Sequence, residues 1–212
     1  MEIFLDTADV DYVAFYKSFI DGVTMNPSLV AKSGRDDYEG LIKEICQQIS
    51  GHVSIEVISN GYDDMLVEAK QLAKIYNNVC IKLPCTFDGL RACRKLSSDG
   101  IPTNLTLCFS STQALLAAKC GATYVSPFVG RLDDIGHDGV ALLEEIVNIF
   151  ATHEYETRVL AASIRNLQHL IQAALIGVNA VTLSPQILQQ CFDHPLTIKG
   201  LEIFKKDWEN KQ

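Results

Sequence analysis

Asn78-Val79-Cys80-Ile81-Lys82-Leu83-Pro84 is a short apolar segment with a single lysine inside it and a proline at its end. The aliphatic residues alternate with the others, so on a β-strand Lys82 points away from the face that carries Val79, Ile81 and Leu83. Lysine is almost never fully buried without a partner. Either Lys82 protects an exposed edge strand from aggregation, or its amine has a chemical use.

A buried lysine amine can act as a nucleophile. Burial disfavours the ammonium form and lowers the pKa, and the neutral amine attacks carbonyl carbons to form Schiff bases. An unperturbed lysine has a pKa of about 10.4, so little of it is reactive at pH 7 without such a shift. By itself, the segment favours the interpretation of Lys82 as an edge-strand lysine. A reactive amine would need partner residues from the rest of the chain.

Composition and charge narrow the class of protein. The 212 residues are 48% hydrophobic and 21% charged, which is typical of one globular α/β domain of this length. The net charge of −8 argues against nucleic acid and anionic membranes as partners. The seven cysteines are odd in number and lack metal-type spacing, which indicates reduced thiols. Because the N-terminus has no signal sequence and no apolar run is long enough to span a membrane, we expect a cytoplasmic protein.

Strand and helix patterns alternate along the whole chain. The predicted strands cover residues 2–6, 21–25, 53–58, 78–84, 102–107, 123–126, 158–162 and 180–183. The predicted helices cover residues 8–19, 35–49, 62–76, 86–97, 111–119, 140–150, 166–175, 185–191 and, at the C-terminus, 196–208. This alternation without a linker predicts one (β/α)8 TIM barrel over residues 1–212 with an additional C-terminal helix. The alternative is a doubly wound open sheet, which is disfavoured because Asp6-Thr7-Ala8-Asp9 is no glycine-rich phosphate loop.

Polar residues gather at the predicted C-terminal ends of the strands, where such a barrel carries its active residues. Each has a structural explanation by itself: Asp6 as a helix cap, Asn26 as a turn residue, Arg131 and Arg165 as surface ion-pair partners. Their convergence is harder to explain in this way, because structural barrel interiors prefer Val, Ile and Leu. The candidate site residues are Asp6, Thr24, Asn26, Glu56, Lys82, Asn104, Thr106, Ser126, Phe128, Arg131, Ser163 and Arg165.

Five motifs resemble the transaldolase family in order and spacing. They are Gly22-Val23-Thr24-Met25-Asn26-Pro27-Ser28, Ile81-Lys82-Leu83-Pro84, Asn104-Leu105-Thr106-Leu107, Ser126-Pro127-Phe128-Val129-Gly130-Arg131 and Ala162-Ser163-Ile164-Arg165-Asn166. The likeness covers essentially the whole chain, whose length matches the short-chain subfamily that also includes the fructose-6-phosphate aldolases. It implies class I aldol chemistry on sugar phosphates, with no cofactor and no metal.

The resemblance also implies roles for the candidate residues. Lys82 would form the Schiff base, Asp6 would be the general acid/base, and Glu56 would relay protons through a water held by Thr106. Asn26 and Asn104 would hold the dihydroxyacetone hydroxyls. The remaining substrate contacts would come from Thr24, Ser126 and Phe128, with Arg131, Ser163 and Arg165 on the phosphate.

Two positions separate the activities within this resemblance. The aldolase members typically carry glutamine at the place of Glu56 and tyrosine at the place of Phe128. Phenylalanine cannot donate a proton to the enamine, which then waits for an acceptor aldehyde. The resemblance therefore implies a transaldolase, moving dihydroxyacetone from sedoheptulose 7-phosphate or fructose 6-phosphate to glyceraldehyde 3-phosphate or erythrose 4-phosphate in the non-oxidative pentose phosphate pathway.

Three other functions remain open. The first is a fructose-6-phosphate aldolase, a lyase with the same machinery. The second is a non-covalent sugar-phosphate isomerase, with Glu56 as base and Lys82 as electrophile. The third is a non-catalytic ligand-binding or scaffold protein. Met25 and Ile164 depart from the residues common in the family, and neither departure removes a catalytic group.

Two further questions concern assembly and electrostatics. The short-chain relatives form pentamer-based rings, often decamers, so the resemblance implies a homo-oligomer whose helix 196–208 packs on a neighbouring subunit. Alternatively, that helix closes its own barrel. Asp6 and Glu56 near Lys82 would favour its ammonium form, whereas attack needs the neutral amine, and the sequence leaves this balance open.

Overall fold

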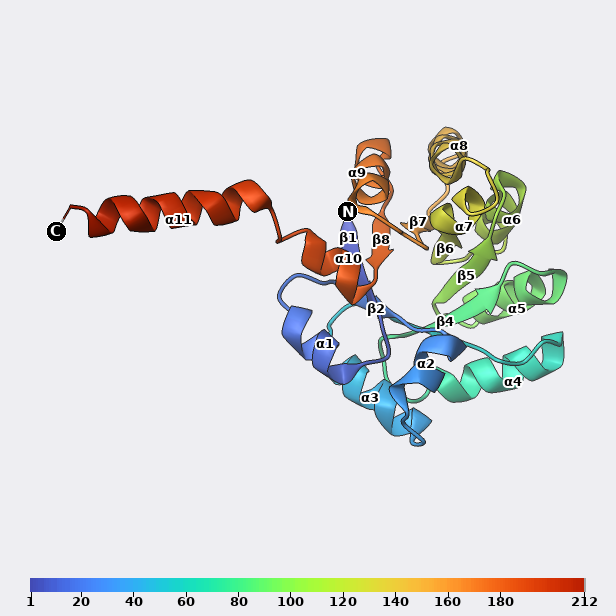
Figure 1. The fold of residues 1–212 in the computed structure, drawn as a ribbon. Coiled ribbons are helices and arrows are strands. Elements are labelled where there is room, and N and C mark those ends of the chain that lie inside the picture. The colour runs from blue at the N-terminus through green and yellow to red at the C-terminus, as the bar shows by residue number, and fades with distance from the viewer. Residues whose placement is uncertain (212) are drawn as a thin grey trace.

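The computed structural model describes residues 1–211, and within them eight parallel strands close into a barrel in the order of the chain (Figure 1). The first and last strands pair, with Phe4 opposite Thr182, and this pairing closes the sheet. The predicted (β/α)8 TIM barrel is confirmed, and the alternative of an open doubly wound sheet is wrong. The strands are β1 (Glu2–Asp6), β2 (Gly22–Thr24), β3 (Val53–Glu56), β4 (Val79–Pro84), β5 (Thr103–Cys108), β6 (Tyr124–Pro127), β7 (Arg158–Ala161) and β8 (Ala180–Leu183).

Helices connect the strands and, except for the last one, surround the barrel (Figure 1). They are α1 (Val10–Tyr16), α2 (Pro27–Ser33), α3 (Tyr38–Gln48), α4 (Tyr62–Leu72), α5 (Phe87–Ser98), α6 (Ser111–Lys119), α7 (Val129–Asp133), α8 (Gly139–Thr152), α9 (Leu167–Ile176), α10 (Pro185–Gln190) and α11 (Pro195–Glu209). The sequence did not predict α2 or α7. Asn26 caps α2 and Pro27 begins it, so the proline that ends the predicted strand also starts a helix, because its fixed φ suits a first turn.

The alternation of strand side chains produces two apolar layers. One face of each strand packs outward against the helices, as Ile55, Ile81 and Leu105 do. The other face points into the barrel, where Phe4 and Tyr124 meet edge to face at 5.7 Å within a buried cluster. This inner cluster also contains Cys80, Leu160, Ala162 and Ala180. It forms an apolar floor, and inward residues two positions further along the strands lie above it, towards the C-terminal ends.

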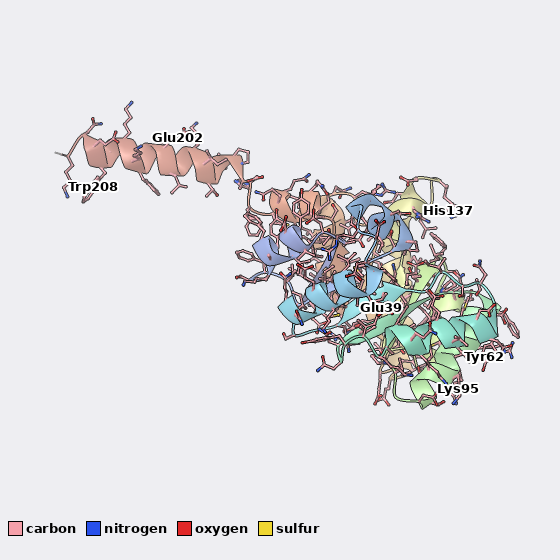
Figure 2. The ribbon with its side chains drawn as sticks, turned by 90° about the horizontal axis from the view of Figure 1, so that it is seen from below. Glu39, Tyr62, Lys95, His137, Glu202 and Trp208 are labelled. Carbon is pink, nitrogen blue, oxygen red and sulfur yellow. The ribbon has the colours of Figure 1, made fainter. Side chains whose placement is uncertain are left out.

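The last helix lies apart from the barrel. Figures 1 and 2 show α11 extending away from the body of the molecule, and within Pro195–Glu209 no side chain is buried. Leu201, Phe204 and Trp208 are 64%, 72% and 66% exposed. The alternative that this helix closes its own barrel is therefore wrong.

Candidate active site

Lys82 lies inside the barrel, above the apolar floor, and is only 6% exposed. Its Nζ is 2.8 Å from Oε2 of Glu56 and donates a hydrogen bond to the carbonyl oxygen of Met25 at 3.2 Å. The contact with Glu56 follows from the register, which pairs the two residues directly across β3 and β4. Because β4 lies between β3 and β5, the interpretation of Lys82 as an edge-strand lysine is wrong.

Asp6 lies at the end of β1, partly buried, in a chain of hydroxyl groups. Thr24 donates to Asp6 Oδ1 at 2.7 Å, and Thr24 Oγ1 lies 2.7 Å from Thr182 Oγ1. Burial raises the pKa of Asp6 above that of an ordinary aspartate, and the Lys82 ammonium and the Thr24 hydrogen bond offset part of that rise. A carboxylate with a raised pKa is well suited to accept and return a proton. The alternative role as a helix cap is wrong, because Asp9 caps α1.

Asn104 is held in one orientation by two buried hydroxyl groups. Ser126 donates to Asn104 Oδ1 at 2.7 Å, and Asn104 Nδ2 donates to Ser54 Oγ at 3.1 Å. All three residues are at most 1% exposed. A side-chain amide has two N–H donors, so one of them remains for a ligand.

Thr106 is also fully buried, on the strand next to Lys82. Its register partner on β4 is Pro84, two residues beyond the lysine. Thr106 Oγ1 has no hydrogen-bond partner within residues 1–211. Buried hydroxyl groups are nearly always satisfied, so an unpaired one marks a place where a ligand or solvent molecule belongs.

Asn26 serves the fold and the cavity together. Its Oδ1 accepts a hydrogen bond from Leu29 N at 3.0 Å, which caps α2, and the residue also lines the cavity that contains Lys82. Asn26 was interpreted as a turn residue, and the structure instead makes it a helix cap. This role is compatible with ligand binding because the amide N–H groups are not used by the cap.

Two arginines mark the outer end of the site. Arg131 lies over the ring of Phe128, with its guanidinium carbon 5.1 Å from the ring centroid. Arg165 forms an ion pair with Asp134 at 2.9 Å, and both side chains are more than half exposed. Such an exposed pair contributes little to stability, so the guanidinium remains available to an anion. The suggestion that Arg165 has an ion-pair partner at the surface was correct.

The arginines are brought together by a close contact between two segments. Gly130 N donates to the carbonyl oxygen of Ser163 at 2.9 Å. A Cβ at Gly130 would lie 2.3 Å from Cγ of Arg165 and 2.4 Å from that carbonyl oxygen, so only glycine fits here. Ser163 has a φ of 57°, a left-handed conformation that non-glycine residues rarely adopt.

These groups surround a cavity of about 160 Å³ at the C-terminal ends of the strands. Of the twelve predicted residues, nine line it, and the other three lie beside it: Glu56 contacts Lys82, Asn104 contacts Ser126, and Thr106 is buried on β5. The lining residues are Asp6, Thr24, Asn26, Lys82, Ser126, Phe128, Arg131, Ala162, Ser163, Arg165 and Thr182. The site thus combines a buried amine, two carboxylates and an arginine-rich outer end.

Two polar residues of the site were missed by the sequence reasoning. Thr182 lies two residues after the inward Ala180 on β8, which gives it the inward direction. Ser54 lies two residues before Glu56 on β3 and therefore shares its face of the strand. Strand parity was thus a usable signal for both.

The remaining candidate groups add no second site. Within residues 1–211 the seven cysteines are all free, and burial raises the pKa of Cys80, below Lys82, to about 12. In the same part of the chain, no three His, Cys, Asp or Glu side chains are grouped so as to hold a metal ion. None of the helices that the structure describes has both the length and the apolar character needed to cross a membrane.

Comparison with known proteins agrees with this geometry. The model of the family described as "Transaldolase/Fructose-6-phosphate aldolase" matches residues 3–212. A protein of Rhizobium meliloti (strain 1021) is 55% identical over 98% of this chain and 96% of its own length. One of Thermodesulfovibrio yellowstonii is 54% identical over 99% and 98%. Both carry the name "Probable transaldolase". The chain belongs to the transaldolase/fructose-6-phosphate aldolase family.

Proposed function

We propose that the protein is a transaldolase that works through a Schiff base on Lys82. The observation that carries this proposal is the contact between Lys82 and Glu56, 2.8 Å apart, with Lys82 lining a polar cavity. An ammonium next to a carboxylate can hand its proton over directly, and the neutral amine that results is the nucleophile. Asp6 lines the same cavity as Lys82 and is close enough for the two charges to interact, so a second carboxylate lies near the amine.

The chemistry balances without a cofactor. The Lys82 amine adds to the ketone carbon of a ketose phosphate, and loss of water gives an iminium ion. Asp6 removes the proton of the hydroxyl next to the breaking carbon–carbon bond, whose electrons move into the iminium to form an enamine, and an aldose phosphate leaves. The enamine carbon then attacks a second aldose phosphate, and Asp6 returns the proton. Hydrolysis of the new imine restores Lys82.

The supporting residues have separate tasks in this proposal. Glu56, with a water held by Thr106, exchanges protons as the carbinolamine forms and collapses. Asn26 and Asn104, each fixed by a hydrogen bond to its amide oxygen, present N–H groups to the dihydroxyacetone hydroxyls. Arg131, Ser163 and Arg165 bind the phosphate at the outer end.

Phe128 separates transfer from simple cleavage. It lines the cavity, and its ring packs against Phe109, with 5.6 Å between the centroids. A phenyl ring donates no proton to the enamine, so the three-carbon unit stays on Lys82 until an acceptor aldehyde arrives. The donors would be sedoheptulose 7-phosphate or fructose 6-phosphate, the acceptors glyceraldehyde 3-phosphate or erythrose 4-phosphate, in the cytoplasmic pentose phosphate pathway.

The first experiment measures glyceraldehyde 3-phosphate release from fructose 6-phosphate with and without erythrose 4-phosphate. Release that depends on the acceptor supports transaldolase, and equal release without it identifies an aldolase. Borohydride reduction in the presence of fructose 6-phosphate should attach the three-carbon unit to the peptide that contains Lys82. An isomerase or a scaffold protein gives no such adduct.

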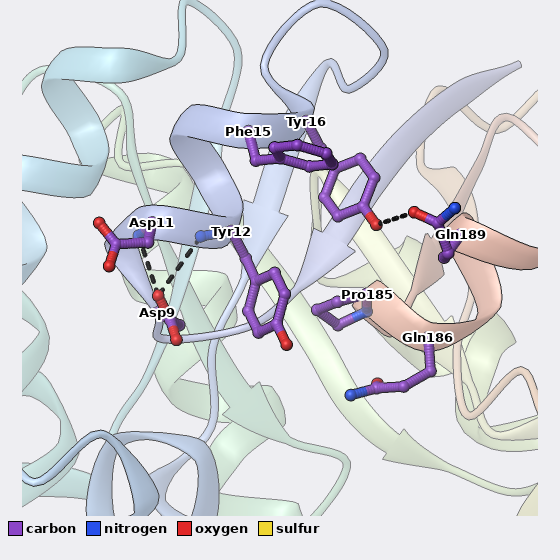
Figure 3. A pocket seen from close by; sticks show the side chains of 8 residues that line it. All are labelled: Asp9, Asp11, Tyr12, Phe15, Tyr16, Pro185, Gln186 and Gln189. Atoms are coloured by element: carbon purple, nitrogen blue, oxygen red, sulfur yellow. Dashed lines mark hydrogen bonds between the residues drawn. The ribbon is translucent and has the colours of Figure 1, made fainter.

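We also propose a homo-oligomer, a pentamer or decamer, in which α11 packs on a neighbouring subunit. Figure 3 shows a groove between α1 and α10 that is lined by Tyr12, Phe15, Tyr16 and Pro185 and has a volume of about 680 Å³. Tyr16 donates to Gln189 at 2.8 Å across its floor. The groove suits the exposed apolar face of α11 from a second copy.

Apolar character, not charge, supports this occupant. The lysines of α11 (Lys199, Lys205, Lys206) are balanced by as many acidic residues (Glu202, Asp207, Glu209), whereas its apolar side chains are exposed. The test compares the mass in solution of the full chain with that of a chain ending at residue 194. Dissociation of the shorter chain supports the proposal, and an unchanged assembly contradicts it.

A further inference from the structure

Two segments carry the arginines of the outer end: α7, and the loop after β7 that leads into α9. Backbone hydrogen bonds join them, from Val129 N to the carbonyl oxygen of Ala162 at 3.0 Å and from Gly130 N to that of Ser163 at 2.9 Å. A third connection runs through side chains and involves His169 on α9, which the sequence reasoning did not single out.

His169 bridges Asp133 and the backbone of Arg165. Its Nε2 lies 2.9 Å from Asp133 Oδ2, and its Nδ1 accepts a hydrogen bond from Arg165 N at 3.3 Å. Because Nδ1 is the acceptor, the neutral ring carries its proton on Nε2 and donates it to Asp133. The imidazole itself is only 12% exposed, whereas the Asp133 side chain is 37% exposed.

Asp133 and the backbone of His169 are each held by a further hydrogen bond. Asp133 Oδ1 accepts a hydrogen bond from Gly139 N at 3.0 Å, which fixes the carboxylate between α7 and α8. The backbone of His169 donates to the Asn166 cap at 2.8 Å, which fixes the start of α9. The imidazole therefore has one orientation available to it.

The backbone that His169 holds is strained. Ser163, two residues before Arg165, has a φ of 57°. A left-handed conformation of a non-glycine residue persists only where its surroundings hold it, and such residues cluster at ligand-binding sites. The bond from Arg165 N to His169 Nδ1 is one of the contacts that hold this turn.

We propose that His169, oriented by Asp133, is a positioning residue for the phosphate-binding end of the site. It does not touch the substrate, because its donor is occupied by Asp133 and its acceptor by Arg165. It keeps Ser163 and Arg165 in the conformation that can bind a phosphate dianion. This inference rests on the proposed function, because it takes the arginine-rich end as the phosphate site.

Three substitutions separate the two contacts. His169→Asn keeps an acceptor at the place of Nδ1 and loses the contact with Asp133. His169→Gln keeps a donor at the place of Nε2 and loses the acceptor for Arg165 N. His169→Leu loses both, and His153→Leu, at an exposed histidine at the end of α8, is the matched control.

In steady-state kinetics with fructose 6-phosphate, the substitutions should change KM much more than kcat. We expect KM to rise about 3- to 10-fold in His169→Gln and His169→Leu, as for the loss of one hydrogen bond, with kcat within about twofold of the parent. In His169→Asn we expect KM within about twofold of the parent. The control should match the parent throughout, and unphosphorylated fructose should show the same KM in all variants.

Inorganic phosphate, titrated by calorimetry without turnover, provides the second measurement. Its Kd should rise in parallel with KM in the glutamine and leucine variants. If the parent binds phosphate and the variants follow this order, the positioning role holds even where fructose 6-phosphate is not turned over, and only the proposed function fails. Equal phosphate affinity in all folded variants, or a fall in kcat at constant KM, would overturn the inference.

Discussion

Oε2 of Glu56 and Nζ of Lys82 lie 2.8 Å apart because the register of β3 and β4 sets these two residues directly opposite each other inside the barrel. The side chains of Lys82 and Glu56 are 7% and 15% exposed, so little water separates either group from its partner. The pair therefore has a structural consequence as well as a chemical one.

Lys82→Met should abolish borohydride trapping and also destabilise the fold. Removing one partner of a buried ion pair costs up to about 3–5 kcal/mol, since it leaves the other charge unpaired. Lys82→Met combined with Glu56→Gln should recover much of that loss, because the glutamine carries no charge. Urea unfolding of both variants checks this, and a double variant less stable than the single one contradicts the coupling.

Thr106→Val should lower activity and change stability little. The substitution keeps the shape and removes a buried hydroxyl that makes no hydrogen bond to any other group in residues 1–211. If that hydroxyl holds the water used by Glu56, kcat should fall about 10²-fold.

The matched control for Thr106 is Thr103→Val on the same strand. Thr103 Oγ1 has a partner, Cys93 Sγ at 3.3 Å, so its loss should bring no gain in stability and no change in kcat. Thermal unfolding and initial rates of both variants are compared. A Thr106→Val enzyme with parental kcat would remove Thr106 from the mechanism.

Asp6→Asn should lower kcat about 10²- to 10⁴-fold and change how stability depends on pH. Burial raises the folded-state pKa of Asp6 above its ordinary value of 3.8. Between the pKa of Asp6 in the unfolded state and its higher pKa in the folded state, the folded state binds more protons. The free energy of unfolding therefore falls as the pH rises through this range, and it stays lower at higher pH. The asparagine variant lacks this fall.

The measurement is the midpoint of thermal unfolding of both proteins from pH 3 to pH 8. The midpoint of Asp6→Asn should rise relative to the parent as the pH increases and stay above it at neutral pH. A parent that gains stability relative to the variant over this range would show that Lys82 and Thr24 outweigh burial at Asp6.

Gly130→Ala should weaken substrate binding with a smaller effect on the chemistry. The new methyl group would meet Cγ of Arg165 at 2.3 Å and must displace the arginine or part α7 from the loop after β7. We expect a rise in KM of about 10-fold and a loss of about 1–3 kcal/mol of stability. Gly61→Ala is the control, because its nearest neighbour would be Asp64 Oδ2 at 3.7 Å.

Much of the fold and of the site was predictable from strand patterns. The period of two along each strand indicated that Glu56 and Lys82 point inward, and both do. Parallel strands in chain order then bring their C-terminal ends to one mouth, which is why residues far apart in the sequence line a single cavity.

The features that were missed leave no trace in the pattern of apolar and polar residues along the strands. The carbonyl oxygen of Met25 receives a hydrogen bond from Lys82, and a backbone acceptor has no sequence signature. His169 lies on a helix and contacts Arg165 N, so it is not among the polar residues at the ends of the strands. The short helices α2 and α7 offer too few residues for a helical period to be recognised.

The pairing of β1 with β8 makes the order of folding matter. It joins the two ends of the barrel-forming chain, so its contacts have the largest sequence separation in the sheet. Bringing such distant segments together costs more chain entropy than a local contact does, so we expect this pairing to form late in folding. The hydroxyl contact between Thr24 and Thr182 depends on that pairing, and Thr24 in turn holds Asp6. Until β8 has paired with β1, Thr24 lacks its contact with Thr182, so the hydroxyl chain that holds Asp6 is complete only once the barrel is closed.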